Sequence, residues 1–317
     1  MFAQLRDISV NFGEVRALDS VSLDISPNQI HAIVGENGAG KSTLMSVLFG
    51  LNVNYGGQIF INDTHKTWAT PSDAIKAGIG MVHQHFMLIE SMTVLENIIL
   101  GSEPNKYLGF LDFQRAEKKL SNLLHTYNFS INLHQTVDKL SVGQRQMVEI
   151  LKTLYRSAEL IILDEPTAVL TPAERLDLFS SLQDFKNAGK SIILITHKID
   201  EVIANADHVS VMRAGQLISS LPIEGTSQTQ ISEEIVGLSK TKNISRKKIK
   251  AGSVKLNLRN LAILGMPQVG NAFNLEVKAR EIVGIAGVAG NGQSQLVEAI
   301  VGLRSSKSGL IEICNTD

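Results

Sequence analysis

The stretch Gly35–Thr43, GENGAGKST, combines glycines, a lysine and two hydroxyl side chains at the spacing of a phosphate-binding loop. An apolar run at residues 30–34 precedes it and an apolar-periodic stretch at residues 44–49 follows it, which predicts a strand, a loop and a helix. Glycines let backbone N–H groups turn toward phosphate oxygens, and the N-terminus of the helix adds positive potential. We therefore expect phosphates to bind here, because the flanking strand and helix argue against a chance match.

Two side chains of this loop have specific chemistry. Lys41 brings a full positive charge to the β- and γ-phosphates of a nucleotide, and the hydroxyl of Ser42 can ligate Mg²⁺. The cofactors implied are therefore ATP and Mg²⁺. The nucleotide-binding residues expected in the loop are Gly35, Glu36, Asn37, Gly38, Ala39, Gly40, Lys41, Ser42 and Thr43.

A second stretch, residues 287–295, repeats this pattern 252 positions further along the chain. Gly35, Gly38, Gly40, Ser42 and Leu44 recur as Gly287, Gly290, Gly292, Ser294 and Leu296. Lys41 does not recur, because Gln293 occupies the equivalent position. The chain is expected to hold one complete phosphate-binding loop and the beginning of a second, altered copy.

Composition limits the classes of protein that fit. The 317 residues suggest two domains, or one domain and part of another, and 44% apolar residues suffice for packed cores. The net charge of −1 gives no global footprint of nucleic-acid binding, and the single cysteine, Cys314, excludes an intramolecular disulfide and fits a reducing compartment. The N-terminus lacks the apolar core of a signal peptide, and no apolar run is long enough to span a bilayer. Any membrane role is therefore expected to go through a partner.

Two short, wholly apolar runs, residues 160–163 and 192–195, are typical of buried parallel strands. The segment between them predicts a helix with Thr171 as N-cap and Glu174 completing a capping box, ended by Gly189. A second helix is predicted in the same way, starting at Thr70-Pro71-Ser72-Asp73 and ending at Gly78. Strands alternating with helices indicate a doubly wound α/β core.

The segment from Lys240 to Lys250 contains six basic residues and no acidic ones. It fits a solvated linker better than an anionic-lipid or nucleic-acid contact, because no aromatic residues interleave and a new domain pattern follows. We expect a first domain at residues 1–239, a basic linker at 240–252 and the N-terminal part of a degenerate second domain at 253–317. A complete second copy would need many more residues, so the chain is expected to be a fragment.

Four further segments follow the first loop in a specific order. They are MVHQHF at residues 81–86, LSVGQ at 140–144, LIILDEPT at 160–167 and ITH at 195–197. With the loop, this ordered set resembles the ATP-binding subunits of ABC transporters, over residues 1 to about 238. The resemblance implies an α/β P-loop NTPase core of ABC type with a helical subdomain at about residues 90–145, followed by a partial second copy.

The carboxylates that end the LIILDEPT strand have distinct expected roles. Asp164, at the tip of a buried strand, suits a Mg²⁺ site, directly or through water. Glu165 is placed to orient and polarise the attacking water as general base. Two such acids could be solvated turn residues, but the four residues before them are fully apolar. The resemblance further implies that His197 contacts the γ-phosphate and that Gln84 links Mg²⁺ and water to the transport partner.

The LSVGQ segment supplies Ser141, Gly143 and Gln144 ahead of a helix expected at residues 146–152. The Ser141 hydroxyl and the Gly143 N–H can hold a γ-phosphate bound by an opposing domain, since the sites of this family are composite. Phe12 is the candidate for stacking on adenine, from its position ahead of the loop, and a core phenylalanine is an equal alternative.

Two departures from the general pattern narrow the branch. In the LSVGQ segment at residues 140–144, called the signature segment below, Val142 replaces a glycine. The segment 168–171, AVLT, replaces the usual Ser-Ala-Leu-Asp. Both resemble the tandem ATPases of sugar and nucleoside importers. The nucleoside-import group is the most similar in the strings HQHFMLIESMTVLENIILG, EILKTLYRSAELIILDEPTAVLTPAE, SIILITHKIDEV and GIAGVAGNGQSQLVEAIVGL.

The resemblance predicts an ATPase subunit that powers uptake of nucleosides or related solutes, peripheral on the cytoplasmic face of the cell membrane. Its implied partners are two membrane permeases and an external substrate-binding lipoprotein, with no nucleic acid. A ribose- or galactose-type sugar importer is an alternative. A soluble ABC ATPase acting on ribosomes or DNA is another, although basic arms and coiled-coil insertions are lacking. A small-molecule kinase would not need LSVGQ, Gln84 and His197 together.

Overall fold

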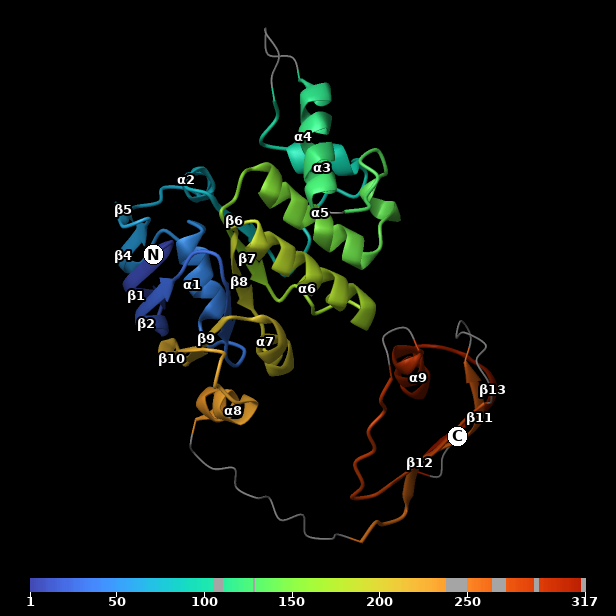
Figure 1. The fold of residues 1–317 in the computed structure, drawn as a ribbon. Helices are drawn as coiled ribbons and strands as arrows, with labels where there is room; N and C mark the ends of the chain where they lie inside the picture. The colour runs from blue at the N-terminus through green and yellow to red at the C-terminus, as the bar shows by residue number, and fades with distance from the viewer. Residues whose placement is uncertain (105–110, 128, 238–249, 264–271, 288–290, 315–317) are drawn as a thin grey trace. The chain divides into compact units, whose positions relative to one another are not determined.

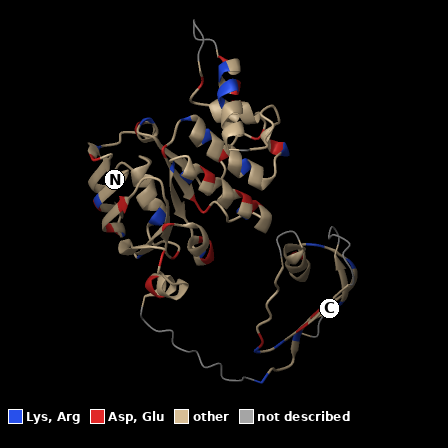
Figure 2. Ribbon diagram, in the orientation of Figure 1, with Lys and Arg blue, Asp and Glu red and all other residues tan. Residues whose placement is uncertain are grey.

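The computed structural model describes residues 1–104, 111–127, 129–237, 250–263, 272–287 and 291–314 (Figure 1). The chain divides into two compact units, Met1–Ser239 and Lys240–Asp317. Residues 240–249 of the expected basic linker lie outside the described residues. Figure 2 shows that residues of both charge signs are interspersed over the helices and strands of the first unit.

A six-stranded sheet forms the centre of the first unit, in the order β10-β9-β3-β8-β7-β6. Its strands are β3 (Ile30–Val34), β6 (Ile79–Val82), β7 (Leu160–Asp164), β8 (Ser191–Ile195), β9 (His208–Arg213) and β10 (Gln216–Pro222). All neighbouring pairs are parallel except β9 and β10. Every residue of β3, β6, β7 and β8 is buried, which confirms the prediction of buried parallel strands. Because the strands are parallel, the segments that follow them emerge at one edge of the sheet.

An antiparallel sheet in the order β2-β1-β4-β5 lies beside this core (Figure 1). Its strands are β1 (Ala3–Phe12), β2 (Val15–Ile25), β4 (Gly56–Ile61) and β5 (Thr64–Lys66). Helix α1 (Lys41–Leu48) contributes Leu44 and Leu48 to a core that also holds Leu5 from β1 and Ile162 from β7. Full burial of each such side chain contributes about 2 kcal/mol, so the loop ahead of α1 stands on a packed base.

Helices cover both faces of the parallel sheet, as the doubly wound prediction requires. The helices next to it are α2 (Pro71–Lys76), α6 (Pro172–Asn187), α7 (Ile199–Asn205) and α8 (Gln228–Val236). Helix α6 begins as predicted, since the Thr171 side chain accepts from the Glu174 N–H and the Glu174 carboxylate returns to Thr171. Its apolar face, with Leu178, Leu182 and Phe185, packs on β7 and β8.

Three helices, α3 (Val94–Ile99), α4 (Phe113–Thr126) and α5 (Val142–Tyr155), gather away from the antiparallel sheet (Figure 1). A short 3₁₀ turn, η2 (Val137–Lys139), precedes α5, and these elements share their own apolar cluster. The prediction that α5 begins near residue 146 is wrong. Ser141 caps the helix, accepting from the Gln144 N–H, so α5 begins at Val142 and Gly143 lies in its first turn.

The described residues of the second unit form a three-stranded sheet and one helix. Its elements are β11 (Val254–Ile263), β12 (Phe273–Lys278), α9 (Gln293–Ile300) and β13 (Ser306–Ile313). The sheet order β12-β11-β13 corresponds to the order β2-β1-β4 in the first unit, since in each sheet the first strand in sequence lies between the other two. Leu258, Leu261 and Leu296 are among the buried residues of its small core.

One irregularity occurs in both antiparallel sheets. In the first, Asp7 has φ 52° opposite Gly57 with φ 100°, and in the second, Asn260 has φ 47° opposite Gly309 with φ 97°. A Cβ on Gly57 would lie 2.4 Å from the Arg6 carbonyl, and a Cβ on Gly309 would lie 2.4 Å from that of Asn260. Both glycines are therefore needed for the same close approach of two backbones.

Within the described residues, no helix combines the length and the apolar character that crossing a bilayer requires.

Candidate functional site

Lys41 is the first residue of α1 and only 6% exposed. Its Nζ donates to the carbonyl oxygens of Gly35 at 2.8 Å and Glu36 at 2.9 Å. Burial lowers the pKa of the ammonium, while the nearby carboxylates of Glu165 and Asp164 raise it. The charge of Lys41 is thus held inside the loop, within range of the two acids that end β7.

Two glycines of the loop are fixed by close backbone approaches. Gly40 has φ 99°, and a Cβ there would lie 2.8 Å from the Ala17 carbonyl. A Cβ on Gly35 would lie 2.2 Å from the Met212 carbonyl. Residues 36–38 between them are exposed, while Ala39 is buried. The loop therefore presents a short stretch of backbone to solvent at the N-terminus of α1.

Ser42 and Asp164 meet at this N-terminus. The Ser42 Oγ donates to Asp164 Oδ1 at 3.3 Å, and Asp164 is 8% exposed. Burial raises the pKa of Asp164, an effect that the Ser42 hydrogen bond opposes and the charge of Glu165 reinforces. The described residues contain no group of three or more His, Cys, Asp or Glu side chains that could hold a metal. A hydroxyl and one carboxylate fit Mg²⁺, which takes few protein ligands and completes its shell with phosphate and water oxygens.

Glu165 lies between the other two residues predicted to act in hydrolysis. Its Oε2 accepts from Gln84 Nε2 at 3.4 Å, and its Oε1 lies 3.1 Å from His197 Nδ1. Gln84 follows β6, Glu165 follows β7 and His197 follows β8, so the parallel register brings all three to one edge. The Glu165 backbone has φ 48°, and its N–H donates to the Ile195 carbonyl at 3.0 Å.

A second network, which sequence reasoning missed, ties these strand ends together. Thr167 donates to Glu201 Oε2 at 2.7 Å, and Lys198 Nζ donates to the Thr167 carbonyl at 3.0 Å. Lys198 and Arg175 both pair with Glu201, at 3.2 and 3.6 Å. The network joins the segment after Glu165 to the segment after His197. Lys198 is a near neighbour of Glu201 in sequence, but Arg175 comes from α6 and Thr167 from the segment after β7, so the sequence does not mark Glu201 as the centre of a network.

The signature segment forms a separate cluster whose partners come from α6. Gln144, one of the residues expected to bind nucleotide, closes a capping box, since its Oε1 accepts from the Ser141 N–H at 3.0 Å. The Ser141 Oγ and the Gly143 N–H both donate to Glu174 Oε1, at 3.2 and 3.0 Å. The role of Glu174 as a capping residue was predicted, but its contact with the signature was not.

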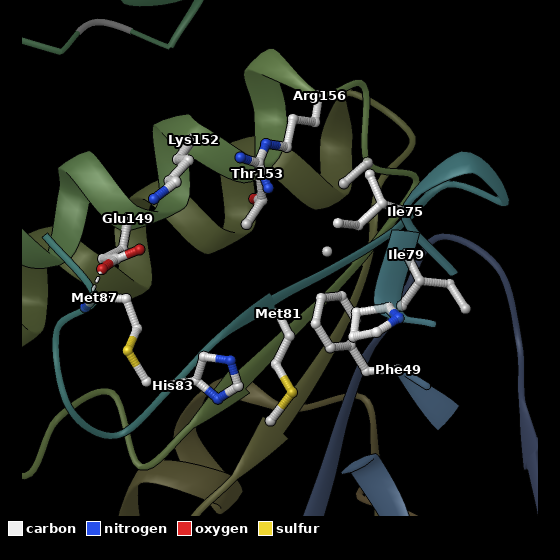
Figure 3. A pocket seen from close by; sticks show the side chains of 13 residues that line it. Phe49, Ile75, Ile79, Met81, His83, Met87, Glu149, Lys152, Thr153 and Arg156 are labelled. Carbon is white, nitrogen blue, oxygen red and sulfur yellow. Dashed lines mark hydrogen bonds between the residues drawn. The ribbon is translucent and has the colours of Figure 1, made fainter. Parts of the chain in front are cut away.

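A pocket of about 260 Å³ lies beside the segment that carries Gln84 (Figure 3). Figure 3 shows Glu149 and Lys152 on α5, and Arg156 just after it, facing the pocket from one side, with Met81 and His83 opposite. Glu149 is 6% exposed, and its Oε1 accepts from the Met87 N–H at 2.6 Å. This bond fixes the course of the chain just after Gln84, a role that the sequence did not indicate.

Phe12 ends β1 with 57% of its surface exposed. This exposure removes the alternative that Phe12 is a core residue. Stacking on adenine remains a prediction.

The second glycine loop is described in part, because residues 288–290 lie outside the described residues. Gly292 caps α9 with φ 98° and ψ 6°, as Gly40 caps α1 with φ 99° and ψ 0°. A Cβ on Gly287 would lie 2.1 Å from Gln293 Nε2. The Gln293 amide therefore lies close to Gly287, much as the Lys41 ammonium lies close to Gly35.

Curated relatives match almost the whole chain. The chain is 44% identical over 317 residues to the nucleoside import ATP-binding protein NupA of Lactococcus lactis, covering 99% of this chain and 62% of that protein. It is 42% identical to the guanosine import ATP-binding protein NupO of Bacillus subtilis, covering 98% of this chain and 61% of that protein. The ribose import ATP-binding protein RbsA of the same organism is 34% identical, with 99% and 63% covered. The chain thus spans less than two thirds of the length of these relatives.

Solved structures and a family model agree with the fold. A nucleotide-free ATP-binding cassette of an ABC transporter has a TM-score of 0.65 at 28% identity, covering 77% of this chain and 97% of the cassette. The ADP conformation of another cassette has a TM-score of 0.66 at 29% identity, with 74% and 98% covered. The family model described as ABC transporter matches residues 18–168, which include Lys41, Asp164 and Glu165. The chain therefore contains a domain of the ABC transporter family.

Proposed function

We propose that the loop at Lys41 binds MgATP and that Glu165 is the general base for its hydrolysis. The observation that carries this proposal is the contact of Glu165 with both Gln84 and His197, beside the Lys41 loop. Two side chains, from the segments that follow β6 and β8, converge on the carboxylate that follows β7, which no single motif would require. A general base must lie within hydrogen-bond reach of the water it polarises. Glu165 lies at the carboxyl ends of the parallel strands, on the same side of the sheet as the loop at Lys41.

Each residue then has a defined task. Lys41 and the loop N–H groups bind the β- and γ-phosphates, and Ser42 and Asp164 hold Mg²⁺. The ion neutralises charge that develops on the phosphates. Glu165 orients and deprotonates the water, and Gln84 and His197 hold its carboxylate in place. His197 also contacts the γ-phosphate, and Gln84 links Mg²⁺ and water to the transport partner. Phe12 stacks on the adenine from the end of β1.

We further propose that hydrolysis powers import of a nucleoside. This rests on the names of two relatives, a nucleoside and a guanosine import ATP-binding protein. A ribose importer is the second candidate, on the strength of RbsA. The partners proposed are two membrane permeases and an external binding lipoprotein, with the chain peripheral on the cytoplasmic face. Co-purification with permeases supports this assignment, whereas co-purification with ribosomes or DNA contradicts it.

Residues 253–317 are proposed to begin a second nucleotide-binding domain. The shared sheet order, the shared bulge at Gly57 and Gly309, and the glycine caps of α1 and α9 support this assignment. In composite sites, each loop faces the signature of the other domain. The strong loop at Lys41 would then need a signature that residues 253–317 do not supply.

Steady-state phosphate release against protein concentration tests the composite site. We expect little release at low concentration and a steep rise as two first domains begin to pair. Lys41→Ala provides the control, with release at background. Fast turnover that is independent of concentration would show that one chain contains the whole site, and accumulation of a phosphorylated small molecule would identify a kinase instead.

A further inference from the structure

A carboxylate of the same chain, that of Glu174, accepts hydrogen bonds from the signature segment. Ser141 Oγ and the Gly143 N–H donate to the same oxygen of Glu174, Oε1, at 3.2 and 3.0 Å. A Cβ on Gly143 would lie 2.6 Å from that oxygen, so the carboxylate packs directly on the first turn of α5. The two donors are the hydroxyl and the backbone N–H proposed above to hold the γ-phosphate of an opposing ATP.

Capping of α6 does not require this second contact. The other oxygen of Glu174, Oε2, accepts from the Thr171 N–H at 3.0 Å and the Thr171 hydroxyl at 2.9 Å, which completes the capping box. The capping box of α3 has the same form, with Glu96 Oε2 accepting from Thr93 N–H at 2.8 Å and from its hydroxyl at 2.7 Å. One carboxylate oxygen therefore suffices to cap a helix. In Glu174 the remaining oxygen, Oε1, contacts the start of α5 in addition.

Glu174 is an anion under ordinary conditions. The Thr171 N–H, and with it the donors of Gly143 and Ser141, hold the pKa of its carboxyl below the usual range. A carboxylate oxygen and a phosphate oxygen are both charged acceptors that seek the same kind of donor. The two groups cannot occupy the Ser141 and Gly143 donors together.

We propose that Glu174 is a gating residue: its carboxylate occupies the place of the γ-phosphate on the signature segment and must withdraw before an opposing ATP can be held there. The proposal rests on the proposed function, since it takes the signature as a phosphate-binding element. A cavity of about 570 Å³ lies beside the contact, lined by Ser141, Gly143 and Glu174 and by Met147 and Asp177. Oε1 can turn into this space while Oε2 stays on Thr171, so α6 keeps its cap when the gate opens.

The test uses inorganic phosphate as the probe and the Gly143 amide as the reporter, in NMR spectra of the full chain. Glu174→Gln keeps the shape but removes the charge that competes for the donors. We expect the Gly143 amide of this variant to respond at phosphate concentrations about tenfold lower than in the wild type, because a charged acceptor is replaced by a neutral one. An unchanged midpoint, or a Gly143 amide that phosphate does not shift in either protein, would overturn the proposal.

Two control variants separate gating from capping. Glu96→Gln weakens the equivalent box on α3, and Thr171→Ala weakens the box on α6 while leaving Glu174 Oε1 on the signature. Both are expected to leave the phosphate midpoint at Gly143 unchanged. An equal shift in Thr171→Ala would assign the effect to loss of the α6 cap and contradict a gate.

The same spectra keep the two proposals distinguishable. MgATP should shift the amides of Gly38 and Gly40, and this response should vanish in Lys41→Ala. Absence of that response would mean failure of the proposed function. A normal loop response together with an unchanged Gly143 midpoint in Glu174→Gln would mean that the gate alone is wrong. In the wild type, the Gly143 amide should also follow the titration of Glu174, and a flat profile would show that the contact is not made in solution.

Discussion

The two glycine-loop regions share a glycine-capped helix after the loop but differ in what precedes the loop. Helices α1 and α9 both follow a glycine with φ close to 100°. Residues 30–34 form the buried strand β3, whereas the equivalent apolar run, residues 282–286, forms no strand, and Ile282 is fully exposed. Local sequence thus suffices for the glycine cap and the helix, while the strand needs neighbours.

Those neighbours come from far along the chain. β3 pairs with β8 and β9, which lie at residues 191–213. Among the described residues of the second unit, no strand pairs with residues 282–286. A central parallel strand has both edges hydrogen-bonded and both faces covered, so it does not form without them. The second difference is chemical, because Gln293 is neutral where Lys41 is charged.

Hydrogen exchange tests the structural half of this comparison and should give the largest effect. Amides of β3 should exchange only when the core opens, which costs several kcal/mol of free energy. Their exchange should therefore be slower than in an unfolded peptide by roughly a thousandfold or more. Amides of residues 282–286 should exchange within about tenfold of an unfolded peptide. Mass spectrometry of the full chain measures both, and strong protection at 282–286 would break the comparison.

Glu165→Gln should slow ATP hydrolysis by about a hundred- to ten-thousandfold, since it removes the base but keeps the shape. MgATP affinity should stay within about threefold, because Glu165 carries none of the phosphate contacts. Single-turnover phosphate release and equilibrium binding separate the two effects. Normal turnover would assign the base to another group.

Lys41→Gln gives the first loop the residue of the second. MgATP affinity should fall about a hundredfold, or ~3 kcal/mol, because a charged hydrogen-bond donor is lost from a partly buried site. Isothermal titration measures the change. Wild-type affinity in this variant would show that Gln293 does not weaken the second loop.

His31→Val copies the residue that the second unit has at the equivalent position, Val283. Burial, and then the charge of His208, lowers the pKa of His31 to about 3. Below pH 6.5 the unfolded chain takes up a proton that the folded chain does not, so stability falls with pH from 6.5 toward 3. From pH 7.5 to 5, the free energy of unfolding should fall by about 2 kcal/mol more in the wild type than in the variant.

Fluorescence of the single tryptophan, Trp68, during urea unfolding reports on the first unit, in which it is buried. Ser210 keeps a partner in the variant, since its hydroxyl also lies 2.8 Å from Ser220 Oγ. Parallel pH profiles for the two proteins would contradict the role of His31.

Gln293→Lys should have the smallest effect. In a Lys41→Ala background, we expect MgATP binding to rise by no more than about threefold, because a charge alone does not restore the strand that positions the loop. Tight binding would mean that the missing lysine, and not the missing strand, is what separates the two regions.

The sequence predicted those features that depend on near neighbours. The loop at Lys41, the cap at Thr171 and the buried strand ending at Asp164 each follow from a few consecutive residues. Roles for Gln84 and His197 were predicted only through the family resemblance, and their contacts with Glu165 were not predicted. Spacing along the chain does not give the register of parallel strands.

Features that depend on distant packing were missed. Glu201 and Glu149 look like ordinary helix residues, yet both are buried and bonded to segments from other elements. The same holds for Glu174, since its local capping task hides its contact with α5. The run at residues 282–286 shows the converse, because it is apolar like residues 30–34 but forms no strand in the described structure.

The left-handed backbone at Glu165 has a consequence for engineering. A residue with a Cβ at φ 48° costs about 1 kcal/mol relative to glycine, so Glu165→Gly should relax the chain locally while removing the carboxylate. Activity and thermal stability therefore oppose each other at this one position. A screen for heat-resistant variants that ignored turnover would enrich chains that have lost the base.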